Sequence, residues 1–205
     1  MKIGLISDIH ASPEPLEEAL AIFRQEQTDQ IWCAGDIVGY GQQAQKTIQL
    51  LQENNCQVIQ GNHESWYQVK HHADADPSVL AYLNDLPLVK QLNYESQLIY
   101  MVHASPPEHM TGGIRLRDRA GQLDAQQMAH WTTMLKPFDY DVLIVGHTHQ
   151  VFAEKLGNML VINPGSTHFN HCCGVLSLPD LTVKWFALSG RSIAYSWNWG
   201  DTLSA

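Results

Sequence analysis

The chain has 205 residues, of which 44% are hydrophobic and 16% charged, a composition typical of one globular domain over residues 1–205. Its formal net charge of -9 disfavours a stable complex with nucleic-acid backbones. No apolar run reaches the ~18 residues of a membrane span, so no membrane partner is expected. The four cysteines show no disulfide pattern, which favours a cytoplasmic location.

The first ten residues predict a buried strand that ends in two polar side chains. Ile3, Leu5 and Ile6 form its apolar part, and Asp8 and His10 follow. Because residues two apart in a strand point to the same side, this carboxylate and this imidazole leave the strand end together. They are one edge of a candidate metal site.

Helices and strands alternate after this strand. Ser12-Pro13 is typical of a helix N-terminus, and the apolar spacing that follows predicts a helix leading to a parallel strand from Ile31. The remaining elements are expected as a helix at 42–54, a strand at 58–59, broken helical structure at 64–87, and strands at 88–92 and 97–103. This βαβαβ order, followed by mostly strands, predicts an α/β fold, and a two-sheet sandwich flanked by helices fits it best.

Residues 104–121 have no pattern of helix or strand and carry several arginines. Loops of this length are usually functional or disordered. Since a guanidinium group can clamp phosphate oxygens, Arg115 and Arg117 are candidate substrate-binding residues, with a solvated basic loop as the alternative. After the loop, Asp124 is expected to cap a helix, and the chain from residue 142 predicts short strands separated by turns.

Polar side chains follow five of the expected strands in the same way. They are Asp8 and His10, Asp36, Asn62 and His63, His103, and His147 and His149. Ligands bind beyond the carboxyl ends of strands in open α/β sheets, so these side chains are expected to form one site. His and carboxylate ligands suit Mn, Fe, Zn or Ni, and the lack of Cys argues against a structural zinc site. Asp36 can bridge two ions, since a carboxylate has two oxygens.

The motifs D-x-H, G-D, G-N-H-E, a lone His after a strand, and G-H-T-H occur here in that order. Together with Asn163-Pro164-Gly165-Ser166, they resemble the calcineurin-like metallophosphoesterase superfamily, in its branch of small single-domain phosphodiesterases. The resemblance implies that Asp36 bridges two ions and that His63 stabilises or protonates the leaving oxygen, with a metal-bound hydroxide as nucleophile. The first ion would be held by Asp8, His10 and His149, and the second by Asn62, His103 and His147.

The resemblance implies a four-layer αββα sandwich of two mixed β-sheets flanked by helices. It also implies a phosphodiesterase with two divalent transition-metal ions (Mn, Fe, Zn or Ni) and a small phosphate-ester substrate such as a nucleotide. One alternative is a phosphomonoesterase, nucleotidase or phosphoprotein phosphatase. Another is a non-catalytic metal-binding interaction scaffold. Family members that resemble scaffolds have lost some of the catalytic residues. Here His63 and every ligand position are present, which favours an enzyme.

The end of the chain is rich in aromatic residues. Ile193, Tyr195, Trp197 and Trp199 alternate with polar or small residues, a strand-like pattern. Packing of this tail on the core is expected, with a homo-oligomer contact as the alternative, because aromatic residues are enriched at interfaces.

Overall fold

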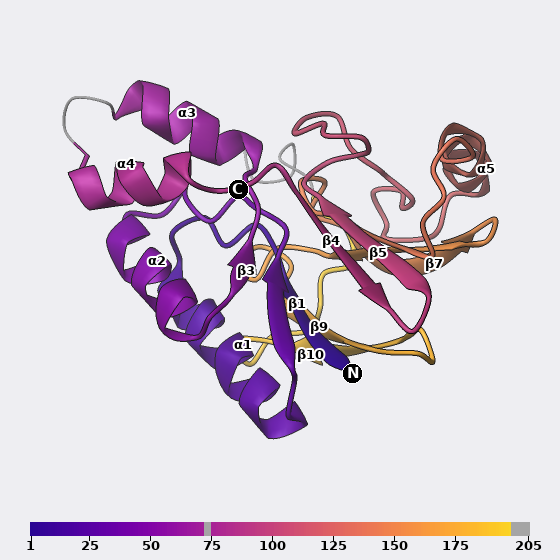
Figure 1. The fold of residues 1–205 in the computed structure, drawn as a ribbon, viewed down its shortest axis with the longest axis horizontal. Coiled ribbons are helices and arrows are strands. Elements are labelled where there is room, and N and C mark those ends of the chain that lie inside the picture. The colour runs from indigo at the N-terminus through magenta and orange to yellow at the C-terminus, as the bar shows by residue number, and fades with distance from the viewer. Residues whose placement is uncertain (72–74, 198–205) are drawn as a thin grey trace.

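The computed structural model describes residues 1–71 and 75–197 (Figure 1). One sheet contains β1 (Lys2–Ile6), β2 (Gln30–Cys33), β3 (Gln57–Val58), β9 (Cys172–Ser177) and β10 (Thr182–Ala187). The other contains β4 (Val89–Tyr94), β5 (Gln97–Val102), β6 (Val142–Ile144), β7 (Val151–Leu156) and β8 (Met159–Pro164). The helices are α1 (Pro13–Glu26), α2 (Ala44–Glu53), α3 (Asn62–Lys70), α4 (Pro77–Asn84) and α5 (Ala125–Met134).

Both sheets are mixed. The first has the order β10-β9-β1-β2-β3, with β1, β2 and β3 parallel and β9 antiparallel to β1 and β10. The second has the order β4-β5-β6-β8-β7, with a parallel centre and an antiparallel strand at each edge. The parallel strands of each sheet therefore end at one edge, which is the condition for polar strand ends to meet.

Alternate residues of the central strands face different layers. In β1, Ile3 and Leu5 pack between the two sheets, whereas Ile6 packs under the helices. In β5, Ile99 packs between the sheets and Tyr100 packs toward α5. Because side chains in a strand alternate between its two faces, each sheet shares one core with the other sheet and a second core with helices. The predicted four-layer αββα sandwich is confirmed.

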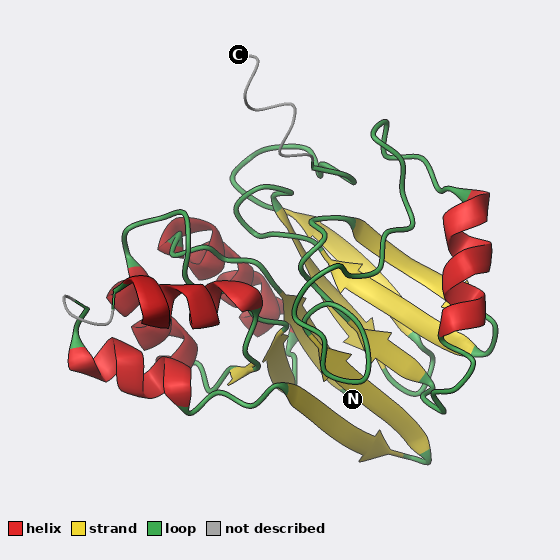
Figure 2. Ribbon diagram, turned by 90° about the horizontal axis from the view of Figure 1, so that it is seen from above, coloured by secondary structure: helices red, strands yellow, loops and turns green. Residues whose placement is uncertain are grey.

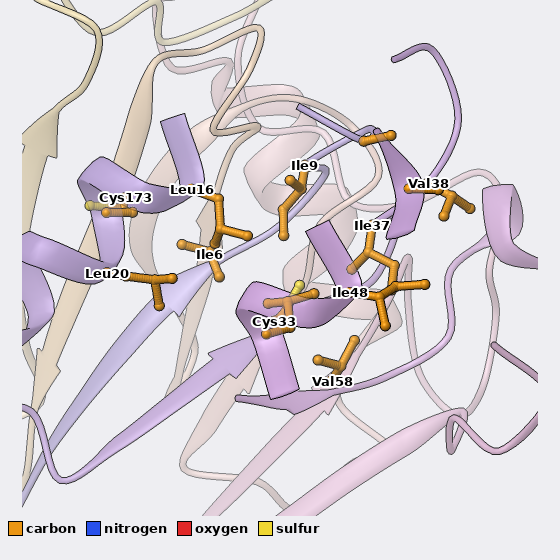
Figure 3. Packing of buried hydrophobic residues seen from close by; sticks show 14 of the residues in the cluster. Ile6, Ile9, Leu16, Leu20, Cys33, Ile37, Val38, Ile48, Val58 and Cys173 are labelled. Carbon is orange, nitrogen blue, oxygen red and sulfur yellow. The ribbon is translucent and has the colours of Figure 1, made fainter. Parts of the chain in front are cut away.

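The helices lie on the two outer sides of the sheets, with α5 alone on its side (Figure 2). The core under α1 and α2 contains Leu16 and Leu20 from α1, Ile48 from α2 and Cys33 from β2 (Figure 3). The apolar spacing of the first helix thus lies on its buried face, as the sequence predicted. No helix in the described part of the chain is long and apolar enough to cross a membrane.

The helices begin close to the residues that the sequence predicted, but the Ser12 side chain does not cap α1. Asp124 caps α5 by accepting hydrogen bonds from the backbone N–H groups of Gln126 and Gln127. Ser12 occupies the N-cap position of α1 but makes no side-chain cap, because its hydroxyl donates to the carbonyl of His10. The expected break between the helices α3 and α4 is present, and α4 begins at Pro77.

The strand-like pattern expected near the end of the chain is wrong for its described part. Residues 193–197 form a single isolated bridge, between Ser196 and Gln150, instead of a strand. The aromatic rings of this segment pack on other side chains, as the Trp197 ring does on Phe169 with centroids 4.1 Å apart. Trp199 lies outside the described residues.

Candidate metal centre

The polar side chains from the strand ends come together in three overlapping groups. In each group the candidate ligand atoms lie within 4.8 Å of one another. The groups are Asp8, His10 and His149; His10, Asp36 and His63; and Asp36, His103 and His147. Shared members join the groups into one site, at the edge where parallel strands of both sheets end.

Spacings in the first group match those of ligands that share one ion. His149 Nε2 lies 3.2 Å from both Asp8 Oδ1 and His10 Nε2, and His10 Nε2 lies 3.9 Å from Asp8 Oδ1. Two ligand atoms bound to one ion at ~2.0–2.2 Å are about 3–4 Å apart, depending on the angle between them. The three side chains therefore fit a divalent transition-metal ion without rearrangement.

A second set of ligand atoms lies around Asn62. His103 Nε2 is 3.1 Å from Asn62 Oδ1 and 3.4 Å from Asp36 Oδ2. The Asn62 oxygen faces only acceptor atoms, and swapping the amide would place its nitrogen 2.8 Å from His147 Nδ1 and 3.0 Å from Met110 O. An ion between these atoms satisfies the same lone pairs without turning the amide. The donor set of Asn62, His103 and His147 thus also fits a divalent cation.

Backbone carbonyls orient two of the imidazoles. His103 Nδ1 lies 2.6 Å from the carbonyl oxygen of Ala34, and His10 Nδ1 lies 3.2 Å from that of Val38. Because a carbonyl oxygen only accepts, each Nδ1 carries a proton, and in the neutral ring Nε2 presents its lone pair to the cluster. Such contacts to the far nitrogen are typical of metal-binding histidines.

Five of the candidate ligands have a left-handed backbone. Their φ angles are 52° at Asp8, 53° at His10, 54° at Asp36, 65° at His147 and 49° at His149. This conformation is uncommon for residues other than glycine and costs on the order of 1–3 kcal/mol each, so it persists only where the surroundings impose it. The turns after β1, β2 and β6 are thus held in strained shapes that aim these side chains inward.

The site concentrates negative charge in a buried place. Burial raises the pKa of Asp8 and of Asp36, but neighbouring imidazoles, His149 and His103 respectively, outweigh it and leave both pKa values lowered. Burial also lowers the pKa of His10 to about 3 and of His147 to about 4. The two carboxylates therefore stay ionised, and the imidazoles of His10 and His147 beside them stay neutral, an arrangement that favours a bound cation.

The His103 imidazole has the opposite shift. Its burial lowers the pKa, but the charge of Asp36 and their hydrogen bond outweigh burial and raise the pKa to about 10. A proton on His103 thus supplies part of the missing positive charge in the absence of metal. Binding of a divalent ion at Nε2 would replace that proton.

Glu64 is a fully buried residue to which the sequence reasoning gave no role. Its Oε2 accepts hydrogen bonds from the backbone N–H groups of Asp36 and Gly61, and its Oε1 accepts from those of Ile37 and Val38. Burial, and then the charge of Asp36, raises its pKa to about 7. Glu64 therefore ties the turn after β2 to the start of α3. A Glu at the third helical position that accepts from the N-cap backbone N–H is one half of a capping box, and this half of the pattern could have signalled Glu64.

The segment Asn163–Ser166 supports two ligand turns. The Asn163 amide donates to the carbonyl of Gly146 and to Thr148 Oγ1, and the Ser166 hydroxyl donates to the carbonyl of Asp8 at 2.5 Å. The amide of Asn170 donates to the carbonyls of His149 and Ala194. These bonds hold the turns after β1 and β6 against each other and fasten the C-terminal segment beside the site.

His63 lies at the open side of the site. Its side chain keeps 12% of its surface exposed, and its Nε2 is 3.9 Å from Asp36 Oδ2. Gly39 approaches it so closely that an added Cβ would lie 2.5 Å from His63 Nδ1, and its φ of 135° also requires glycine. Burial lowers the pKa of His63, while Asp36 opposes the shift. The distance between His63 and Asp36 fits two roles for His63, that of a metal ligand and that of a residue beside the ions that does not bind them.

The loop 104–121 contacts the site, and the two arginines predicted to bind substrate have different surroundings. The carbonyl of Ile114 accepts from Thr148 Oγ1, so the loop packs on the G-H-T-H turn. Arg117 donates to the carbonyls of Val151 and Gly121 and lies over the Tyr195 ring, which makes it a support of the loop. Arg115 is exposed. Substrate binding by Arg115 and Arg117 stays a prediction.

Comparison with known proteins agrees with this geometry. A family model described as the calcineurin-like phosphoesterase superfamily domain matches residues 1–174. A phosphodiesterase of Methanocaldococcus jannaschii is 24% identical over 194 residues, which cover 89% of this chain and 92% of that protein.

Two solved structures share the fold, and each match covers most of both chains. An archaeal phosphodiesterase has a TM-score of 0.61 at 22% identity, covering 92% of this chain and 100% of that one. A hypothetical protein from Pyrococcus horikoshii has a TM-score of 0.73 at 16% identity, covering 94% and 88%.

Proposed function

Because the chain belongs to the calcineurin-like phosphoesterase superfamily, we propose that it is a dinuclear metal-dependent phosphodiesterase acting on a small phosphate diester. The observation that carries the proposal is the pair of ligand sets that meet at Asp36, at spacings of ligands on shared ions. The curated relative named as a phosphodiesterase supports the choice of a diester. The four cysteines are free thiols, which supports a cytoplasmic location.

In this proposal Asp8, His10 and His149 would hold one ion, Asn62, His103 and His147 would hold the other, and Asp36 would contact both. Ions of Mn, Fe, Zn or Ni bound there would supply Lewis-acid chemistry, which lowers the pKa of water and neutralises charge that develops on the phosphoryl group. The carbonyls of Ala34 and Val38 keep the imidazoles in the orientation that binding needs. Glu64 keeps the backbone of Asp36 in place.

His63 donates a proton to the leaving oxygen in this scheme. It sits beside Asp36 without filling either set of ligands, and its ring is the part of the cluster that borders an open pocket. Its backbone N–H donates to Asp36 Oδ1 at 2.9 Å, so the backbone that carries the ring is tied to the bridging carboxylate. A positioned acid of this kind contributes typically ~10²–10⁴-fold to the rate.

The test is hydrolysis of bis(p-nitrophenyl) phosphate and of p-nitrophenyl phosphate by protein stripped of metal and reloaded with Mn²⁺, Zn²⁺, Ni²⁺ or Fe²⁺. We expect hydrolysis of the diester only with metal, and its loss in Asp36→Asn. Asp85→Asn is the control, because Asp85 is exposed at the end of α4. Preference for the monoester would identify a phosphomonoesterase instead. Metal binding without hydrolysis of either ester would identify a scaffold and overturn the proposal.

A further inference from the structure

One face of α3 is lined by His63, Trp66, Tyr67 and Lys70, which follow the spacing of a single helical face. These four side chains, with Gly39, Tyr40 and His71, enclose a pocket of about 200 Å³ directly beside the metal centre. A pocket that holds a whole drug-sized ligand is typically ~300–1,000 Å³. This one therefore fits a part of a substrate whose phosphoryl group lies on the metals.

Aromatic rings connect the pocket to the metal centre. The His63 ring contacts both Tyr40 and Trp66, with centroids 4.8 Å from each, and the Tyr40 ring is 4.7 Å from His10. Tyr40 and Trp66 nevertheless keep 48% and 54% of their surfaces exposed. Two large rings that contact the proposed proton donor and stay half-exposed offer faces and edges to a planar group.

We propose that this pocket binds a nucleobase carried on the ester arm nearest His63, so that the substrate is a nucleotide diester. This inference rests on the proposed phosphodiesterase function and deepens it. The base would pack against Tyr40 and Trp66, and the ammonium group of Lys70 would meet its ring acceptors. A nucleobase fits this pocket better than a second phosphate does. Besides the two histidines, three of the lining side chains are aromatic, those of Tyr40, Trp66 and Tyr67, and the lining contains a single lysine.

The test compares equilibrium binding of two phosphonates to metal-loaded protein by calorimetry. They are the analogues of adenosine 5′-monophosphate and of ribose 5-phosphate in which a CH₂ group replaces the bridging oxygen, so neither can be hydrolysed. We expect the adenosine analogue to bind about 5–10-fold more tightly, near the lower end of what stacking of one base on an aromatic side chain contributes. Both analogues bring the same phosphonate to the metals, so the ratio of their Kd values isolates the base.

Trp66→Ala should reduce this ratio while leaving Kd for the ribose analogue unchanged, and Trp66→Phe should restore it. Val69→Ala is the matched control, since Val69 lies on the same helix and is 83% exposed outside the pocket. Equal Kd values for the two analogues in the wild type would overturn the proposal. So would an equal loss for both in Trp66→Ala, which would make the ring a support for His63. Because the assay needs no turnover, failure of the phosphodiesterase assignment would be seen separately, in the hydrolysis test.

Discussion

Replacement of Glu64 by Gln tests whether a buried carboxylate holds the bridging ligand in place. Its two oxygens accept four backbone hydrogen bonds, from Asp36, Ile37, Val38 and Gly61, at 2.7–3.2 Å. A glutamine keeps one acceptor oxygen and turns an NH₂ group toward the other two N–H donors. Two buried donors then lose their partner, at about 1–3 kcal/mol each.

The expected loss in the free energy of unfolding is thus about 2–6 kcal/mol, reduced in part because a neutral amide costs less to bury than a carboxylate. Urea unfolding of the metal-free protein, followed by circular dichroism, measures it. Glu53→Gln is the matched control, because Glu53 is exposed and such changes usually stay within about 0.5 kcal/mol. A Glu64→Gln protein as stable as the control and with full activity would show that the Glu64 contacts do not hold the Asp36 turn.

His63→Gln should keep both metals, by elemental analysis, and lose turnover by about 10²–10⁴-fold; loss of metal would make His63 a ligand. Arg117→Ala should lower the free energy of unfolding by about 1–3 kcal/mol, because two hydrogen bonds to backbone carbonyls disappear. An unchanged urea midpoint would refute that support role. Arg115→Ala should leave stability within about 0.5 kcal/mol and raise KM for the natural substrate, but not for a small diester. Equal KM effects on both substrates would remove Arg115 from substrate binding.

The sequence was informative where a local pattern determines the outcome. Polar residues directly after buried strands predicted that these side chains would meet, because Asp8 and Asp36 follow neighbouring parallel strands of one sheet. His103 follows a strand of the other sheet, so its approach depends on how the two sheets pack. Apolar spacing predicted the buried face of α1, and Asp124 predicted its cap on α5.

Other features depend on contacts between distant segments, which a local pattern does not encode. The alternation around Tyr195 and Trp197 predicted a strand, but a strand needs the edge of another strand to pair with. Here the Trp197 ring packs on Phe169 and the Tyr195 ring lies under Arg117 instead. The guanidinium of Arg117 is taken up by carbonyls of its own loop and of β7, and the sequence alone indicates no such partners. The left-handed backbone at His147 and His149 likewise arises from the packing of the turn.

The number of metal ions bound per chain shows whether the site is dinuclear. Stripped protein is titrated with Mn²⁺ while the free ion is followed by electron paramagnetic resonance. We expect two bound ions per chain, as in dinuclear sites with a shared ligand, and impaired binding of both in Asp36→Asn. No bound ion, a single ion, or unimpaired binding of two by Asp36→Asn would contradict this expectation.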